Sequence, residues 1–411
     1  ATGKSTSAAG ATVFSVSSGA TINTGAEAAF TTLLNNETNG LITLIDQNLT
    51  VDSGFISVTN ANLFDATTEG VVTASIATDS TVESLKTITG TNNAYTIVVP
   101  TTDAAVSASD LNALNLLTTF AVDLTNVTSI TSSSLVDLGT LSTAIGLDQF
   151  SNDSGITTIA VSDTTIDATT LASTIDTYDS INGSSGTTDM TLASGSTINV
   201  DAGEVTHMLL DETQNRLDIV DQNIVVNPAA TISVSDANLL DATTTGTITA
   251  SIATDSTVDS LKTLTGANNY TIVISSADAT GSTAAELTTI DNATTVQINS
   301  NAITSLTGTY EEIKVLYGSE GVTGLGDENL FVNGDLTVAQ ANEIDALTTG
   351  TVNGGIDDAE TVDSLKTLTG TNAYTIDISA ADATGSTAAE LNIINAKTSE
   401  AVNISNLTDI T

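Results

Sequence analysis

Three stretches of the sequence are near copies of one another, and this internal repetition restricts the possible folds more than any other feature. The copies are Phe64–Gly90 (FDATTEGVVTASIATDSTVESLKTITG), Leu240–Gly266 (LDATTTGTITASIATDSTVDSLKTLTG) and Asp345–Gly370 (DALTTGTVNGGIDDAETVDSLKTLTG). A longer match joins Thr21–Phe64 to Thr197–Leu240. Long-range self-similarity is typical of stacked structural units, in which each repeat contacts only its neighbours. The sequence therefore favours an array over one globular catalytic domain.

Within the repeats, extended segments alternate with short helical segments. Ile248, Ala250 and Ile252 alternate with polar residues, and this period of two indicates a strand. Capping boxes, in which Thr is followed three residues later by Glu or Gln, predict where helices begin. These boxes start at Thr24, Thr283, Thr309, Thr337 and Thr387. Glycines predicted to close the helices are Gly246, Gly266, Gly350 and Gly370.

The length of the repeat selects the architecture. One strand and one short helix in about 21–27 residues is shorter than a βαβ unit of about 30 residues. It suits a right-handed α/β or β-solenoid coil, with parallel strands stacked about 4.8 Å apart and short capped helices opposite them. Tandem β-sandwich domains are the alternative. The helix signals and the presence of only 2 prolines count against them.

The repeats divide the chain into four predicted parts. Residues 1–20 form a small, polar N-terminal extension that is expected to join a neighbouring subunit. Residues 21–176 form the first large repeat, residues 177–352 the second, and residues 353–411 a partial third repeat. No polar cap is recognisable after the third repeat, so its last coil is expected to be open.

The predicted open end resembles an internal part of the chain. Residues 403–411 (NISNLTDIT) match residues 123–131 (DLTNVTSIT), after which the chain continues into further repeat. An uncapped solenoid exposes unpaired backbone groups, which can pair with a strand of another molecule. The residues predicted to take part in self-assembly are Val13, Phe14, Val402, Ile404, Leu407 and Ile410.

The net charge of the chain limits the classes of partner that it can bind. Its 411 residues include 7 Lys and Arg against 49 Asp and Glu, which gives a formal net charge of -42. Such a surface repels phosphate backbones and anionic lipids, so nucleic-acid binding is not expected. Apolar residues make up 40% of the chain, but no run is long enough to span a membrane, so membrane insertion is not expected either.

Calcium is the ligand that the polar residues favour most. Calcium prefers hard oxygen donors, and carboxylates recur at the turns between the predicted strands and helices. The candidate calcium ligands are Asp278, Asp327, Asp335, Asp357, Asp358 and Asp382. None of them lies in an EF-hand loop, and each is also consistent with a solvated turn.

No catalytic residues or organic cofactor are predicted, so the chain is not expected to be an enzyme. His207 is the only histidine and cysteine is absent, which leaves no conventional zinc site. Lys86, Lys262 and Lys366 each follow an acidic residue three positions earlier. This spacing predicts an ion pair on the surface of a short helix.

The repeats resemble tracts of very large cell-surface proteins of marine picocyanobacteria and similar marine bacteria. The residues that carry the resemblance are Thr309–Lys314 (TYEEIK), Gly324–Asn329 (GLGDEN) and Glu343–Val352 (EIDALTTGTV). The resemblance implies an extracellular or cell-surface location and a mechanical or adhesive role. We therefore expect a structural protein that assembles with itself into a filament, stalk or matrix. The alternatives are a calcium-dependent adhesin that binds cell-surface polysaccharide and an ice-binding protein.

Overall fold

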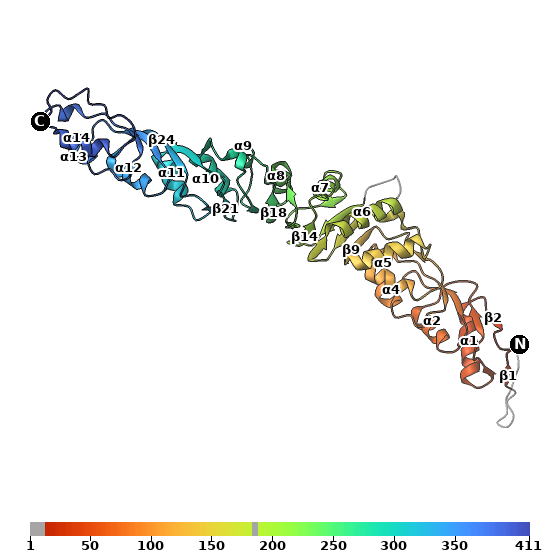
Figure 1. The fold of residues 1–411 in the computed structure, drawn as a ribbon. Coiled ribbons are helices and arrows are strands. Elements are labelled where there is room, and N and C mark those ends of the chain that lie inside the picture. The colour runs from red at the N-terminus through yellow and green to blue at the C-terminus, as the bar shows by residue number, and fades with distance from the viewer. Residues whose placement is uncertain (1–12, 183–187) are drawn as a thin grey trace. The chain divides into compact units, whose positions relative to one another are not determined.

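The structure is a computed structural model that describes residues 13–182 and 188–411. It has a mixed α/β fold in which parallel sheets and helices alternate along the chain (Figure 1). The predicted N-terminal extension, residues 1–20, lies largely outside the described residues. Within residues 13–182 and 188–411, no helix has the length and hydropathy that a membrane span requires.

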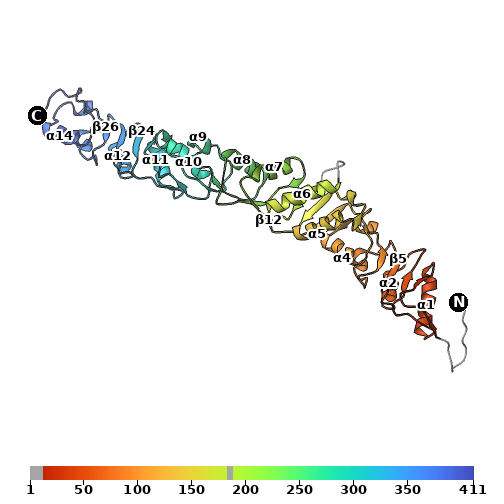
Figure 2. The ribbon, with the colours of Figure 1, turned by 45° about the vertical axis from the view of Figure 1, so that its right-hand side comes forward.

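The chain forms two compact units. The first runs to Ser196 and includes His207–Ile219, and the second comprises Thr197–Thr206 and Val220–Thr411. Within each unit, helices and strands succeed one another in chain order (Figure 2). The four-part division from the repeats follows sequence similarity and not compactness, so it stays a prediction.

Fourteen α-helices lie in the described residues, and most are short. They are α1 (Glu27–Thr38), α2 (Val58–Asp65), α3 (Val82–Leu85), α4 (Ala108–Asn115), α5 (Leu135–Gly146), α6 (Ala168–Asn182), α7 (Val205–Thr213), α8 (Val234–Thr243), α9 (Val258–Leu261), α10 (Ala284–Asn292), α11 (Tyr310–Tyr317), α12 (Val338–Asp345), α13 (Val362–Leu365) and α14 (Ala388–Asn395). Helices of this length are not stable alone in water, so they depend on packing against the strands.

The strands are also short, and they fall into several sheets. In the first unit they are β1 (Phe14–Ser15), β2 (Thr21–Asn23), β3 (Ile42–Thr43), β4 (Asn48–Thr50), β5 (Val72–Ser75), β6 (Ala94–Thr96), β7 (Ala105–Val106), β8 (Val122–Asp123), β9 (Ser129–Ser133), β10 (Phe150–Ser151), β11 (Thr158–Val161), β12 (Thr165–Asp167), β13 (Asp189–Leu192) and β15 (Leu217–Asp218). In the second unit they are β14 (Thr197–Val200), β16 (Asn223–Val226), β17 (Thr231–Ile232), β18 (Ile248–Ile252), β19 (Asn269–Thr271), β20 (Ser282–Thr283), β21 (Ile298–Asn299), β22 (Ser305–Thr309), β23 (Val322–Thr323), β24 (Asn329–Leu336), β25 (Val352–Ile356) and β26 (Ala373–Thr375).

Every strand pair described within a unit is parallel. In the first unit the larger sheets have the orders β2-β4-β5-β6 and β15-β13-β11-β9-β7. In the second unit, Leu306 pairs with Leu330, and Leu330 pairs in turn with Val352. Strands with helices between them and only parallel neighbours do not fit tandem β-sandwiches, whose sheets are antiparallel. The mixed α/β part of the predicted fold class is therefore confirmed.

The core lies between the strands and the helices. On β18, Ile248, Ala250 and Ile252 are buried while Thr249 and Ser251 are partly exposed. This is the alternation that the sequence predicted. Apolar residues of the helices, such as those of α10, cover the strands at helical spacing and complete a thin core.

Four of the five predicted capping boxes are confirmed, at Thr283, Thr309, Thr337 and Thr387. The box predicted at Thr24 is wrong. Helix α1 begins at Glu27, and its N-cap Ala26 makes no side-chain hydrogen bond. Gly25 adopts a positive φ of 75°, so the chain turns between Thr24 and the helix instead of entering it.

The prediction that Gly246, Gly266, Gly350 and Gly370 close helices is wrong, because each lies two to four residues beyond the C-cap of its helix. Helix α8 ends at Thr243 and its C-cap is Thr244, so Gly246 lies beyond the cap. A Cβ atom on Gly246 would lie 2.2 Å from the carbonyl oxygen of Gln222, and one on Gly350 would lie 2.3 Å from that of Glu328. These glycines are required because neighbouring segments approach closely there, not because a helix ends.

Candidate functional site

The six carboxylates predicted to bind calcium do not gather into one site. Asp278 and Asp382 accept hydrogen bonds from the first N–H groups of α9 and α13, at 3.0 Å from Val258 and 2.9 Å from Val362. The other four, Asp327, Asp335, Asp357 and Asp358, are exposed. In the described part of the chain, no three His, Cys, Asp or Glu residues are grouped to hold a metal ion. Calcium binding by these six residues stays a prediction.

A third aspartate makes the same contact as Asp278 and Asp382, and the sequence analysis missed it. Asp103 accepts a hydrogen bond from the Val82 N–H at 2.6 Å, at the start of α3. A carboxylate at a helix N-terminus satisfies an unpaired amide and opposes the helix dipole. The place of Asp103 after the first near copy was the available signal, because Asp278 and Asp382 follow the other two copies in the same way.

The recurring lysines each bridge two acidic groups. The predicted i,i+3 pairs are confirmed, with Nζ to carboxylate distances of 2.7 Å for Lys86–Glu83, 2.6 Å for Lys262–Asp259 and 2.7 Å for Lys366–Asp363. Each Nζ also reaches an acid on the following helix. These second partners are Asp110 at 2.6 Å, Glu286 at 2.8 Å and Glu390 at 2.8 Å. The second contact joins consecutive helices, and the spacing along one helix does not reveal it.

These bridges shift the titration of their partners. The hydrogen bonds that Lys86 donates to Asp110 and Glu83 raise the pKa of Lys86 to about 12. Lys366, together with the backbone and hydroxyl of Thr387, lowers the pKa of Glu390 to about 2. All of these groups are at the surface, where salt and water screen ion pairs, so the bridges orient the helices more than they stabilise the fold.

A buried asparagine forms a second recurring link between segments. Asn268 Nδ2 donates to Asp241 Oδ1 at 2.8 Å, and Asn268 Oδ1 accepts from the Ile248 N–H at 3.0 Å. The adjacent Tyr270 is 0% exposed, and its hydroxyl donates to the Ala237 carbonyl at 3.3 Å. The equivalent asparagines in the other two copies are Asn93 and Asn372. Each copy thus has one polar cluster with its groups satisfied inside an apolar core.

Arg216, the only arginine, is at the centre of an acidic cluster that the sequence analysis did not identify. Its guanidinium contacts Asp176, Asp179 at 2.6 Å and Asp211 at 3.2 Å. The Asp211 side chain is buried, which raises its pKa, while Arg216 and His207 act in the opposite direction. His207 is half-exposed, 3.5 Å from Asp211. The cluster fixes the end of α7 against α6.

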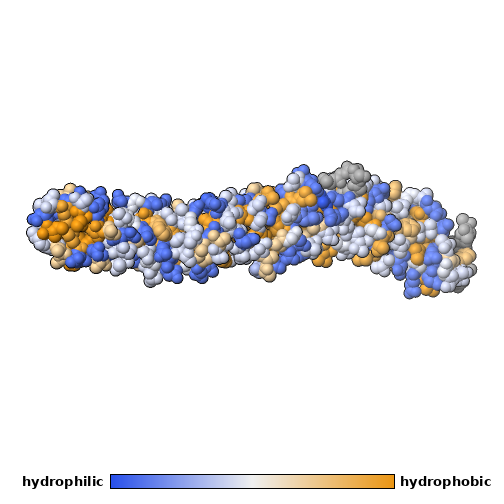
Figure 3. Space-filling view, turned by 45° about the horizontal axis from the view of Figure 1, so that its top comes forward, coloured by the Kyte–Doolittle hydropathy of each residue, from blue (hydrophilic) through white to orange (hydrophobic). Residues whose placement is uncertain are grey.

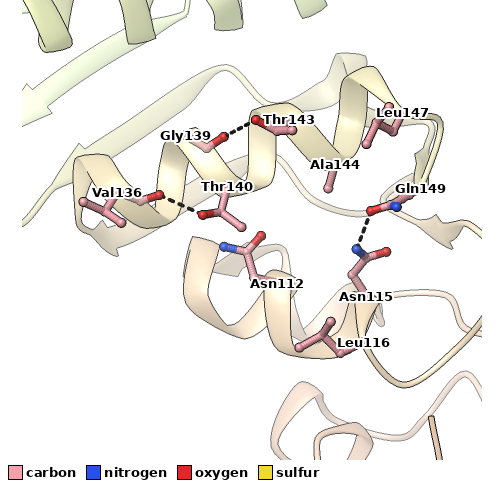
Figure 4. Close-up of a pocket in the computed structure, with 10 residues that line it drawn as sticks. All are labelled: Asn112, Asn115, Leu116, Val136, Gly139, Thr140, Thr143, Ala144, Leu147 and Gln149. Atoms are coloured by element: carbon pink, nitrogen blue, oxygen red, sulfur yellow. Dashed lines mark hydrogen bonds between the residues drawn. The ribbon is translucent and has the colours of Figure 1, made fainter.

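A groove of about 520 Å³ lies between α4 and α5 (Figure 4). Leu116, Val136 and Leu147 line it and are at least 65% exposed. At one end, Asn115 Nδ2 donates to Gln149 Oε1 at 2.7 Å. No charged side chain lines the groove, and nothing in the described structure shows what covers it.

The predicted self-assembly residues lie on the first and last described segments. Exposure is 54% for Val13, 50% for Phe14, 43% for Ile404 and 45% for Ile410, while Val402 and Leu407 are partly buried. Phe14 pairs with Ile42 through β1 and β3. Near the C-terminus, Ile410 forms an isolated parallel bridge with Ser386.

The internal segment that matches the last segment in sequence, residues 123–131, has its apolar side chains buried. Leu124, Val127 and Ile130, which correspond in sequence to Ile404, Leu407 and Ile410, are each 0% exposed. Ile130 lies in β9, which has parallel neighbours on both sides, β7 and β11. The same sequence motif is therefore buried where another segment follows it and half-exposed on the last described segment.

The chain matches no protein family model, no curated protein and no solved structure. The resemblance to giant marine surface proteins accordingly rests on the sequence motifs alone. The calcium-dependent adhesin and the ice-binding protein stay predictions.

Proposed function

We propose that this chain is a non-enzymatic structural protein of the cell surface or the extracellular space. Its segments form a right-handed α/β solenoid, and copies stack end to end into a filament, stalk or matrix. The partner is a second copy of the same chain, whose first coil covers the last coil of its neighbour.

The solenoid part of the proposal is supported by the way that consecutive segments are linked. Strands pair in parallel with the strands of the next segment, and such connections are right-handed in nearly all proteins. The lysine bridges and the buried asparagines also join consecutive segments and recur in each near copy. These are the nearest-neighbour interfaces that a linear repeat array requires.

The observation that carries the assembly proposal is the uneven burial of one motif. Ile404 and Ile410 are 43% and 45% exposed, whereas their internal counterparts Leu124 and Ile130 are 0% exposed beneath a further segment. Figure 3 shows apolar residues gathered at the C-terminal end of the second unit. Burying this surface beneath another coil is favourable by about 25 cal/mol per Å² of apolar area.

Parallel stacking determines how copies would join. The two ends of a stack of parallel strands present opposite edges, so two copies would meet head to tail. A head-to-tail interface does not close on itself unless the rotation permits it, and it therefore generates filaments. The net charge of -42 keeps the flanks of neighbouring filaments apart.

The test is electron microscopy and sedimentation of the purified chain in about 0.5 M salt, where surface charge is screened. We expect filaments or an open series of oligomers, and we expect Ile410→Asp and Ile404→Asp to shift them to monomers. Val136→Asp is the matched control, because Val136 is 78% exposed but lies on α5, and it should leave assembly unchanged. A wild-type chain that stays monomeric at high concentration would overturn the proposal.

A further inference from the structure

One repeated, buried position carries glutamine in two copies and glutamate in the third. The residues are Gln47, Gln222 and Glu328, with side chains that are almost fully buried. Their equivalence is geometric, because each backbone carbonyl accepts a 2.7 Å hydrogen bond from a threonine of the next segment. The three threonines are Thr68, Thr244 and Thr348.

The two glutamines use their amides in the same way. Gln47 Oε1 accepts from the Ile45 N–H at 2.7 Å, and Gln222 Oε1 accepts from the Val220 N–H at 2.7 Å. Each Nε2 donates to the aspartate that precedes it, at 2.8 Å to Asp46 and 2.9 Å to Asp221. In the first copy, Nε2 also donates to the Ser17 carbonyl at 3.2 Å. The NH2 group therefore points at oxygen acceptors.

Glu328 reproduces only half of this pattern. Its Oε2 accepts from the Gly326 and Asp327 N–H groups at 2.8 and 3.2 Å, as the glutamine Oε1 atoms do. Its Oε1 takes the place of the amide nitrogen, is buried and has no hydrogen-bond partner. Glu328 is 1% exposed, and a buried carboxylate oxygen without a hydrogen-bond donor is strongly unfavourable unless a positive group compensates it.

Ser300 contributes a second unsatisfied oxygen in the same region. Thr21 pairs with Asn48 and Ser305 pairs with Asn329, the residues that follow Gln47 and Glu328. Ser300 precedes Ser305 by five residues, so it corresponds to Val16, whose carbonyl accepts from Gln47 Nε2 at 3.5 Å. The Ser300 hydroxyl is itself buried without a hydrogen-bond partner, and the residue is 0% exposed.

We propose that Glu328, Asp327 and Ser300 form a cation site in the second unit, which takes a hard cation of the calcium type in place of the glutamine NH2 group. The donors are the two carboxylates with the carbonyl and hydroxyl of Ser300, and all of them are oxygens, as calcium prefers. The buried Glu328 distinguishes this site from a cluster of exposed acids. The inference does not depend on assembly into filaments.

The experiment compares thermal unfolding of the full chain in EDTA and in calcium chloride at constant ionic strength. We expect calcium to raise the melting temperature of the second unit by about 2–4 °C, which corresponds to a modest ligand-linked stabilisation. Glu328→Gln should abolish this rise. Its melting temperature in EDTA should equal or exceed that of the wild type, because glutamine is the residue that the other two copies carry.

Two further variants separate the site from general attraction of calcium to an acidic protein. Asp358→Asn removes one exposed carboxylate and should keep the full calcium response. Gln222→Glu should create a second calcium-dependent rise. The proposal fails if Glu328→Gln responds to calcium like the wild type. It also fails if the wild type shows no calcium response and is instead stabilised by acid in a manner that Glu328→Gln abolishes, since the occupant would then be a proton.

Discussion

Single side chains in this protein act mainly by linking one segment to the next. Asn268 contacts residues from two other segments, and Lys262 pairs with Asp259 on its own helix and with Glu286 on the next. Such links matter because no segment has a core large enough to be stable alone. The loss of stability on substitution should therefore depend on how buried a residue is and on how many partners it contacts. It should not depend on the distance of the residue from a chain terminus.

Replacing the buried asparagine should be costly. Asn268→Ala would leave the Ile248 N–H without its acceptor and the Asp241 carboxylate without its donor, at about 1–3 kcal/mol for each unsatisfied buried group. Urea-induced unfolding followed by circular dichroism should show the second unit destabilised by about 2–3 kcal/mol. Asn292→Ala, at the exposed end of α10, is the control and should change stability by less than about 0.5 kcal/mol. Equal losses in the two variants would contradict this account of Asn268.

The ion pair between Lys366 and Glu390 should be visible in titration. The pKa of Glu390 is lowered to about 2 from an ordinary value of 4.5. A lowered folded-state pKa contributes stability that is present above the unfolded pKa and is lost as the pH falls from about 4.5 toward 2. In a carboxyl NMR titration, Lys366→Met should move the Glu390 midpoint upward toward 4.5.

Lys397→Met is the control for this titration, because Lys397 has no ion-pair partner in the described structure. The Glu390 midpoint should remain near that of the wild type in this variant, and high salt should narrow the difference between the two variants. If Lys366→Met left the midpoint unchanged, the Thr387 hydrogen bonds alone would account for the lowered pKa of Glu390.

At the scale of the elements, close backbone approach is as important as side-chain packing. Helices α3, α9 and α13 span one turn each, and each begins with a threonine cap and is held by an aspartate of the next segment. Strands of two to eight residues are completed by their parallel neighbours. The glycines at positions 70, 246 and 350 allow these neighbours to meet without a Cβ atom between them.

Adding one methyl group at such a glycine should disrupt the sheet. Gly246→Ala places a Cβ atom against the backbone of Gln222, and we expect a loss of about 1–3 kcal/mol, as for other overpacked positions. Gly139→Ala on α5 meets open space and should instead stabilise by about 0.5–1 kcal/mol, because alanine favours a helix. Thermal unfolding of both variants measures the contrast. If Gly246→Ala left the stability unchanged, the two segments would be able to move apart at little cost in free energy.

At the scale of the whole molecule, charge and apolar burial act against each other. Self-repulsion from a net charge of -42 opposes the approach of copies, while half-exposed residues such as Ile410 favour contact. We predict that the sedimentation coefficient rises between about 0.05 and 0.5 M sodium chloride, because the Debye length falls within that range. Ile410→Asp should remove this salt dependence. Association that weakened with salt would instead indicate pairing between opposite charges.

Sequence periodicity determined the local structure. The alternation around Ile248 and four of the five capping boxes were correct because strand and helix starts depend on residues only a few positions apart. The i,i+3 lysine pairs were predicted for the same reason. The prediction at Thr24 failed because one turn at Gly25 displaced the start of the helix, and a short motif does not report such a turn.

Only the tertiary structure decided which distant residues meet. The register between neighbouring segments determines these contacts. It sets the second carboxylate of each lysine bridge, the acids around Arg216 and the environment of the buried Glu328 oxygen. The exposure of Ile410 against the burial of Ile130 has the same origin, because the two motifs are nearly identical in sequence. Whether a residue is buried depends on which segment packs over it, and a local sequence motif does not specify that segment.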